Sequence, residues 1–154
     1  MTLYPTLLWL YAVMVTVVLG SGVYESLVVH PAWSRKPPES FVEFGSARMN
    51  IGGFWAPVTP LFVLSGLAAW LVAVSAGSPP VPLTVSVACA VAVVVWTLVY
   101  FRPRIAFFLG AGGGDNPAER LRSEARRWVS LNWIRVALTA VSWWGAVRSV
   151  AAHG

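Results

Sequence analysis

The sequence predicts an all-α fold: an integral membrane four-helix bundle, with an interfacial helix in the first loop and a long last helix. Two observations support this prediction. The chain has 154 residues, of which 57% are apolar and 11% are charged, whereas about a quarter of the residues of a soluble domain are charged. The apolar residues also form four runs, each long enough for a helical crossing of roughly 20 residues. We therefore expect one membrane domain over residues 1–154, and we exclude disorder and nucleic-acid binding.

The four runs define the predicted spans. Apolar segments in hydrocarbon must satisfy their own backbone groups, and these runs lack the alternation of barrel strands, so we expect helices. The first run is too long for a signal peptide and has no Lys or Arg in residues 1–8, so we expect it to be retained. We expect Pro31 to end the first helix and the segment 102–104 to close the third. The spans cover approximately residues 3–29, 54–76, 83–101 and 129–150.

Two longer segments link these spans. Residues 31–53 contain a candidate interfacial helix over 37–52, with three apolar side chains expected on the membrane: Phe41, Phe44 and Met49. This helix is either a simple connection between two spans or a lid over a substrate. Residues 102–128 form a basic segment, in which Asn116 followed by proline predicts the start of a helix that continues into the last span.

The positive charges predict the orientation of the chain. Nine of the eleven Lys and Arg residues lie in the two linking segments: Arg35, Lys36, Arg48, Arg102, Arg104, Arg120, Arg122, Arg126 and Arg127. The positive-inside rule places such segments in the cytoplasm. We therefore expect both termini outside the cytoplasm, in a membrane of the bacterial inner-membrane type.

Polar residues at matched depth predict a pocket between the first and last spans. Glu25 and Arg135 each lie about 12–15 Å along their helices from basic residues at the same membrane face. His30 and Asn132 form a second layer, nearer to that face. Ionisable groups inside a membrane are costly and usually functional, so these four residues are candidates for a site that opens to the cytoplasm.

The helical spacing leaves some of this arrangement open. Trp128, Asn132 and Arg135 share one stripe, because they are separated by four and three residues. His30, in contrast, lies about 140° around an ideal helix from Glu25, and only a break at Pro31 would turn it to the same face. Glu25 and Arg135 could also form a buried ion pair that fixes the helix register and has no other role.

Signatures of metal and nucleotide sites are missing from the sequence. It has one cysteine, Cys89, and two histidines, His30 and His153, which the predicted topology places on opposite sides of the membrane. Glu25 and His30 would supply at most two metal ligands, fewer than a typical site needs. The glycine-rich stretch 110–114 does not match a dinucleotide fingerprint. We expect neither a metal nor an organic cofactor.

Three motifs carry a resemblance to a known family: Gly22-Val-Tyr-Glu25, Val29-His-Pro-Ala-Trp33 and Trp128-x-x-x-Asn132-x-x-Arg135. With four spans, a long first loop and a basic stretch before the last span, the chain resembles the anthrone oxygenase-like (DUF1772) family of small four-helix membrane proteins. The likeness covers nearly the whole chain. It implies oxidation of an anthrone to an anthraquinone by O2 as co-substrate, without metal or flavin.

The resemblance also implies roles for individual residues. Glu25 or His30 would act as the base, and Arg135 and Asn132 would stabilise the charge on an oxyanion and on reduced oxygen. A Glu25 carboxylate paired with Arg135 would be a weak base, which favours His30 as the proton acceptor. The expected substrate-binding residues are Trp33, Trp55, Trp128, Arg48 and Tyr24.

Two functions follow from these expectations. The first is a membrane-embedded, cofactor-independent oxygenase that acts on a lipophilic aromatic molecule. The alternative is a non-catalytic membrane module that binds a lipophilic small molecule or a partner membrane protein; the sequence is also compatible with a homo-oligomer. An enzyme requires the four polar residues to converge on a cavity, whereas a binding module could bury them as closed pairs.

Overall fold

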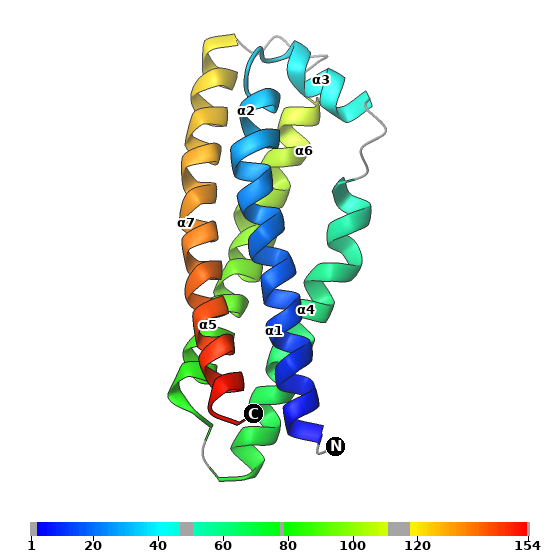
Figure 1. The fold of residues 1–154 in the computed structure, drawn as a ribbon. Coiled ribbons are helices and arrows are strands. Elements are labelled where there is room, and N and C mark those ends of the chain that lie inside the picture. The colour runs from blue at the N-terminus through cyan, green and yellow to red at the C-terminus, as the bar shows by residue number, and fades with distance from the viewer. Residues whose placement is uncertain (1–2, 47–50, 78, 111–117, 154) are drawn as a thin grey trace.

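In the computed structural model of the chain, all regular secondary structure is helical among the residues described, which are 3–46, 51–77, 79–110 and 118–153 (Figure 1). This confirms the predicted all-α class. The elements in chain order are α1 Leu3–Tyr24, η1 Glu25–Val29, α2 His30–Trp33, α3 Glu39–Ser46, α4 Ile51–Ser75, α5 Val81–Trp96, η2 Thr97–Phe101, α6 Arg102–Gly110 and α7 Ala118–Ala151. The labels η1 and η2 denote single π-helical turns.

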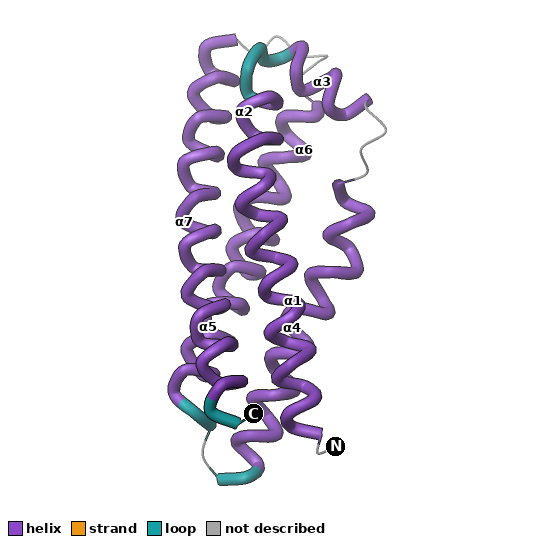
Figure 2. The backbone as a smooth tube through the Cα atoms, in the orientation of Figure 1, coloured by secondary structure: helices purple, strands orange, loops and turns teal. Residues whose placement is uncertain are grey.

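The long helices form a four-membered bundle. α4 packs against α1 and α5, and α7 packs against the same two helices. Both termini lie at one end of the bundle, while α2, α3 and α6 lie at the other (Figure 1). Figure 2 shows that the described loops lie at the two ends of the bundle.

Three helical segments are long and apolar enough to cross a membrane: Leu3–Trp33, Gly52–Ser75 and Val81–Phe108. Large apolar side chains such as Leu64 and Val99 are exposed on their outer faces, as expected for contact with lipid. The chain is therefore an integral membrane protein. The fourth predicted span, 129–150, lies within α7, which is long enough to cross but is not among these three segments. Its crossing and the orientation of the termini stay predictions.

Two of the apolar helices continue through the points where we predicted them to end. The first runs on through Pro31 to Trp33, and the third runs on through Pro103 to Gly110. In both cases a π turn ends two residues before the proline: η1 ends at Val29 and η2 ends at Phe101. A proline ring clashes with the carbonyl four residues earlier in a regular α-helix, and the wider π turn accommodates the ring without ending the helix.

A hydroxyl group lies in each π turn. Ser26 Oγ donates to the carbonyl oxygen of Gly22, and Thr97 Oγ1 donates to that of Val93, both at 2.7 Å. Each hydroxyl thus bonds to the carbonyl four residues earlier, which a backbone N–H of a regular helix would use. The pairing of a hydroxyl with a proline a few residues later is therefore the local sequence feature common to both π turns.

The half of the bundle near the termini is filled by a close-packed core around Tyr11. The Tyr11 hydroxyl lies 2.8 Å from Ser86 Oγ and 3.0 Å from Ser142 Oγ, which joins α1, α5 and α7. The ring of Phe62 in α4 stacks on Tyr11 with centroids 6.0 Å apart. Gly145 allows α7 to approach α5, since a Cβ there would lie 2.4 Å from the carbonyl oxygen of Pro82. No side chain larger than hydrogen fits at this crossing.

The other end of the bundle is closed by an aromatic cluster beneath α3. Its buried aromatic members are Trp33, Phe41, Phe101, Phe108 and Trp128. Phe41 is fully buried, so our prediction that it lies on the membrane was wrong: α3 turns this face toward the protein. Phe44 lies in α3, but its side chain is not described, and Met49, like Asn116, falls outside the described residues.

Candidate active site

A cavity of about 840 Å³ lies inside the bundle, between the Tyr11 core and the aromatic cluster. Its size falls in the range of about 300–1,000 Å³ that is typical of small-molecule sites. Every long helix of the bundle contributes to its wall, and most of the lining side chains are apolar. The polar and charged residues among them are Glu25, His30, Thr59, Thr97, Arg102, Arg135 and Thr139.

The carboxylate of Glu25 lines this cavity and is held by a residue of another helix. Trp55 in α4 donates its indole N–H to Glu25 Oε1 at 2.7 Å. The half-buried Glu25 therefore has one fixed oxygen, while Oε2 makes no hydrogen bond among the described residues. Hydrogen bonds to charged groups contribute about 1.5–3 kcal/mol, enough to orient the carboxylate.

The π turn η1 brings His30 to the same face as Glu25. The backbone N–H of His30 donates to the carbonyl oxygen of Glu25, five residues earlier. Both residues consequently line the cavity, although an ideal α-helix would separate them by about 140°. The imidazole of His30 is buried and packs edge-on against Trp128, with ring centroids 4.6 Å apart.

Asn132 connects His30 to α1 through a short chain of hydrogen bonds. Asn132 Nδ2 donates to Ser26 Oγ at 2.8 Å and lies 3.4 Å from His30 Nδ1. Because the Ser26 hydroxyl already donates to the Gly22 carbonyl, it must accept from the amide, which fixes the orientation of Asn132. His30 Nδ1 then faces a donor and acts as the acceptor of this long contact, so the network assigns the ring hydrogen to Nε2.

Arg135 lines the same cavity but forms no direct ion pair with Glu25 in the described part of the chain. Its guanidinium instead lies over the ring of Phe101 in η2, 4.6 Å from the centroid. The alternative raised by the sequence, a closed ion pair between Glu25 and Arg135, is therefore not found in the structure. The preference for His30 as base depended on that pair, and it loses its support, because the Glu25 carboxylate is bound by a neutral indole and not by a cation.

The structure places only some of the predicted substrate-binding residues in the wall of the cavity. Trp33, Trp55 and Trp128 all line the cavity. Tyr24 does not: its side chain is 60% exposed and lies outside the lining, because the residue before Glu25 points to the outer face of the helix. Arg48 falls outside the described residues.

Some residues at the cavity were not singled out from the sequence. Phe101 supports the Arg135 guanidinium, Arg102 adds a second cation to the wall, and Thr97 lines the cavity from the π turn. Asn132, which was predicted to act directly, is almost fully buried behind His30 and is not part of the lining. Phe101 and Arg102 stood at the predicted end of the third span, and nothing in the sequence connected that position with the site.

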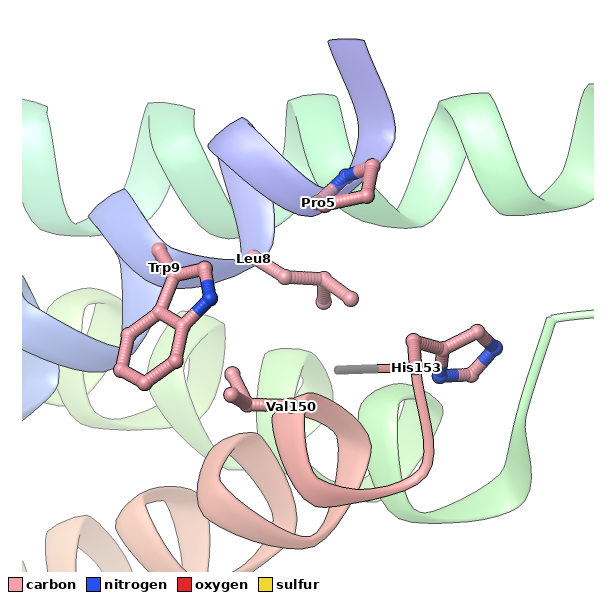
Figure 3. A pocket seen from close by; sticks show the side chains of 5 residues that line it. All are labelled: Pro5, Leu8, Trp9, Val150 and His153. Atoms are coloured by element: carbon pink, nitrogen blue, oxygen red, sulfur yellow. The ribbon is translucent and has the colours of Figure 1, made fainter. Parts of the chain in front are cut away.

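The described residues offer no ready metal site, since no three His, Cys, Asp or Glu side chains gather among them. The cavity itself presents one imidazole and one carboxylate, His30 and Glu25. A second, much smaller pocket of about 30 Å³ lies between the ends of α1 and α7, where Leu8, Trp9 and His153 are among its lining residues (Figure 3). It has room for a water molecule or two and contains none of the predicted site residues.

Comparison with known proteins identifies the family. The family model described as anthrone oxygenase matches residues 51–152. The chain belongs to the anthrone oxygenase family. This confirms the resemblance seen in the sequence and places the chain, at the level of the family, among oxygenase-like proteins. The match to the anthrone oxygenase family includes Trp55, Trp128, Asn132 and Arg135, whereas Glu25 and His30 precede it. No curated protein and no solved structure matches the chain.

Proposed function

We propose that the protein oxidises a lipophilic aromatic substrate, such as an anthrone, to a quinone with O2 and without a cofactor. The observation that carries this proposal is the convergence of Glu25, His30 and Arg135 on one large apolar cavity in a member of the anthrone oxygenase family. A flat tricyclic ring suits a cavity walled by indole side chains, because aromatic rings stack on one another favourably.

Glu25 is the base that we favour. An anthrone carries an acidic methylene group opposite its carbonyl, and removal of one methylene proton gives a resonance-stabilised anion. Glu25 Oε1 is held by Trp55, which leaves Oε2 to accept this proton. His30, whose Nδ1 faces Asn132, would offer its Nε2 hydrogen as a donor. The sequence favoured His30 as the base. In this proposal Glu25 is the base, and His30 donates a hydrogen bond to an oxygen atom.

Arg135 would stabilise the negative charge that develops on the substrate oxygen. O2 then adds to the anionic carbon and forms a peroxide, which takes up a proton from Glu25. Loss of the second methylene proton with cleavage of the O–O bond gives the ketone and water. The balance is one methylene group and one O2 converted to one carbonyl group and one water. No additional electron donor is needed, so the proposal includes no flavin and no metal.

The alternative function, a non-catalytic binding module, is not favoured. It would bury the polar groups as closed pairs, whereas Glu25, His30 and Arg135 each border the cavity. Arg135 rests on an aromatic ring and not on a carboxylate, so its positive charge stays available to a ligand.

Oxygen uptake by purified protein in lipid nanodiscs, given an anthrone, tests the proposal. Metal content is measured in the same sample. We expect metal-free wild type to consume one O2 per quinone formed, and Glu25→Gln and Arg135→Ala to lose this activity. Tyr24→Phe is the matched control, because Tyr24 lies next to Glu25 but outside the cavity. Absence of uptake by wild type, or undiminished uptake by Glu25→Gln, would contradict the proposed chemistry.

A further inference from the structure

Both ends of the cavity are closed by packed side chains. Toward the termini, Phe62 stacks on Tyr11, whose hydroxyl is bonded to serines of two other helices. At the opposite end, Trp33 contacts Phe41 and Phe108 with ring centroids 4.6 and 5.0 Å apart. Among the described residues, packing this dense leaves no passage for a ring system along the axis of the bundle.

Three of the four seams between helices are also joined at the level of the cavity. Asn132 and Ser26 link α7 to η1 by a hydrogen bond. Trp55 links α4 to Glu25. The third contact, of Arg135 with Phe101, links α7 to η2. A substrate could not cross these seams without breaking a polar or cation–π contact.

The fourth seam, between α4 and the segment formed by η2 and α6, is different. α4 packs extensively on α1 and α5, but in the described part of the chain no extensive packing joins it to η2 or α6. Figure 1 shows the half of α4 nearest α3 standing apart from the other helices, and Pro57 and Pro60 lie inside the helix in this region. The seam is therefore the side on which the cavity lacks helix-to-helix packing.

The residues along this seam line the cavity, and all of them are exposed. The seam residues of α4 recur every four positions and are small or compact. The seam residues of η2 and α6 are two apolar side chains and one cation. The six residues are Gly52, Ala56, Pro60, Leu98, Arg102 and Ile105. The α4 row extends over about 12 Å at 1.5 Å per residue, comparable with the length of a tricyclic ring system.

We propose that this seam is a lateral portal, through which a flat, lipophilic molecule dissolved in the bilayer passes directly into the cavity. The identity of that molecule as the substrate rests on the proposed function, but the route does not. Lipophilic compounds concentrate in the hydrocarbon of the membrane, and a side opening spares them transfer through water. Arg102 provides a cation at the edge of the opening, where it contacts a polar end of the ligand.

Photolabelling from the membrane tests the route without requiring turnover. A small aryl diazirine is dissolved in the lipid of nanodiscs that contain the protein, and the labelled residues are identified by mass spectrometry. Thr139 reports on the cavity, because it is buried and lines it; Leu64, which is 62% exposed, reports on the lipid-facing surface. We expect both to be labelled in wild type, and Ala56→Trp to lower the labelling of Thr139 several-fold while Leu64 is unchanged.

Two further variants make the test specific. Leu61→Trp places the same indole side chain at an exposed position of α4 outside the cavity, and we expect it to leave Thr139 labelling at the wild-type level. Phe108→Ala opens the aromatic cluster at the axial end, and it too should leave the labelling unchanged. If Ala56→Trp does not fold, Gly52→Trp takes its place. Labelling confined to Leu64 in wild type, insensitivity to the portal variants, or a rise with Phe108→Ala would overturn the proposal.

The same variants separate the portal from the proposed reaction. If the wild type does not oxidise an anthrone but labelling follows the expected pattern, the proposed function fails and the portal stands. If the wild type is active, Ala56→Trp should raise KM for the bilayer-dissolved substrate several-fold, and Leu61→Trp should not. Activity with a normal KM in a portal variant would support the proposed function and contradict the portal.

Discussion

The backbone N–H of His30 donates to the carbonyl oxygen of Glu25, one π turn earlier, so that the carboxylate and the imidazole border the same cavity. π turns are rare and are often found at functional sites. Here the turn lets two polar residues on a single membrane helix face one ligand. Trp55 and Asn132, from two other helices, then hold these side chains in place.

The Trp55 hydrogen bond should matter for activity because it positions the Glu25 carboxylate. We expect Trp55→Phe to lower kcat for anthrone oxidation by about tenfold, the effect of losing roughly 1.4 kcal/mol from a bond of this class. Trp70→Phe is the control: its indole N–H donates to Thr84 at 3.1 Å, remote from the cavity. Equal kcat values for Trp55→Phe and wild type would show that this bond does not position a catalytic group.

Asn132 should contribute to both stability and activity, because it is buried between Ser26 and His30. Replacing it with Ala leaves the Ser26 and His30 acceptors without a donor, at a cost of about 1–3 kcal/mol in the free energy of unfolding. Reversible unfolding in mixed micelles measures the change. Ser130→Ala, on the exposed face of α7, should alter the stability by less than about 0.5 kcal/mol. The prediction fails if both variants unfold like wild type.

Turnover should require the positive charge of Arg135 and, in part, the planar shape of its guanidinium group. We expect Arg135→Ala to abolish turnover and Arg135→Lys to restore a fraction of it, since Lys supplies the charge but not the planar group that stacks on Phe101. Phe101→Leu removes the cation–π contact, which is worth about 0.5–2 kcal/mol, and should lower kcat less than Arg135→Ala does. Full activity in Arg135→Ala would exclude the assigned role.

Close packing at Gly145 gives a stability prediction that is independent of function. A methyl group at this position would lie 2.4 Å from the Pro82 carbonyl oxygen and 2.9 Å from Ser86 Cβ, so Gly145→Ala must push α7 away from α5. Overpacking of this kind costs about 1–3 kcal/mol. Gly20→Ala is the matched control, because a Cβ there meets nothing within 4 Å. Helix propensity alone should make Gly20→Ala neutral or slightly stabilising. An unfolding assay in which Gly145→Ala is more stable than Gly20→Ala would contradict this packing.

Much of the architecture could be predicted because it depends on composition and helical period. The apolar runs gave three of the membrane helices, and the stripe of Trp128 and Arg135 on α7 does face the cavity. The ends of the first and third helices were predicted wrongly at Pro31 and Pro103. Proline rules assume a regular α-helix before the proline, and here the π turns change the register.

The same change of register explains the errors at the site. The angle of about 140° between Glu25 and His30 holds for an ideal helix, which η1 is not. Phe41 and Tyr24 illustrate a second limit: a single short helix or a single position does not reveal which face packs on the protein. Phe41 is buried and Tyr24 is exposed, and only the surrounding helices decide this. The partner of Glu25, an indole 30 residues away, likewise depends on how α4 lies against α1.

The most direct test of the central claim is the source of the oxygen in the product. Purified, metal-free wild-type protein is given an anthrone under 18O2, and the quinone is analysed by mass spectrometry, with unlabelled quinone incubated in H2 18O as the control for exchange. The proposed reaction predicts one 18O atom in each quinone molecule and loss of this product in Glu25→Gln. A quinone without 18O, or labelled quinone formed equally by Glu25→Gln, would contradict the account.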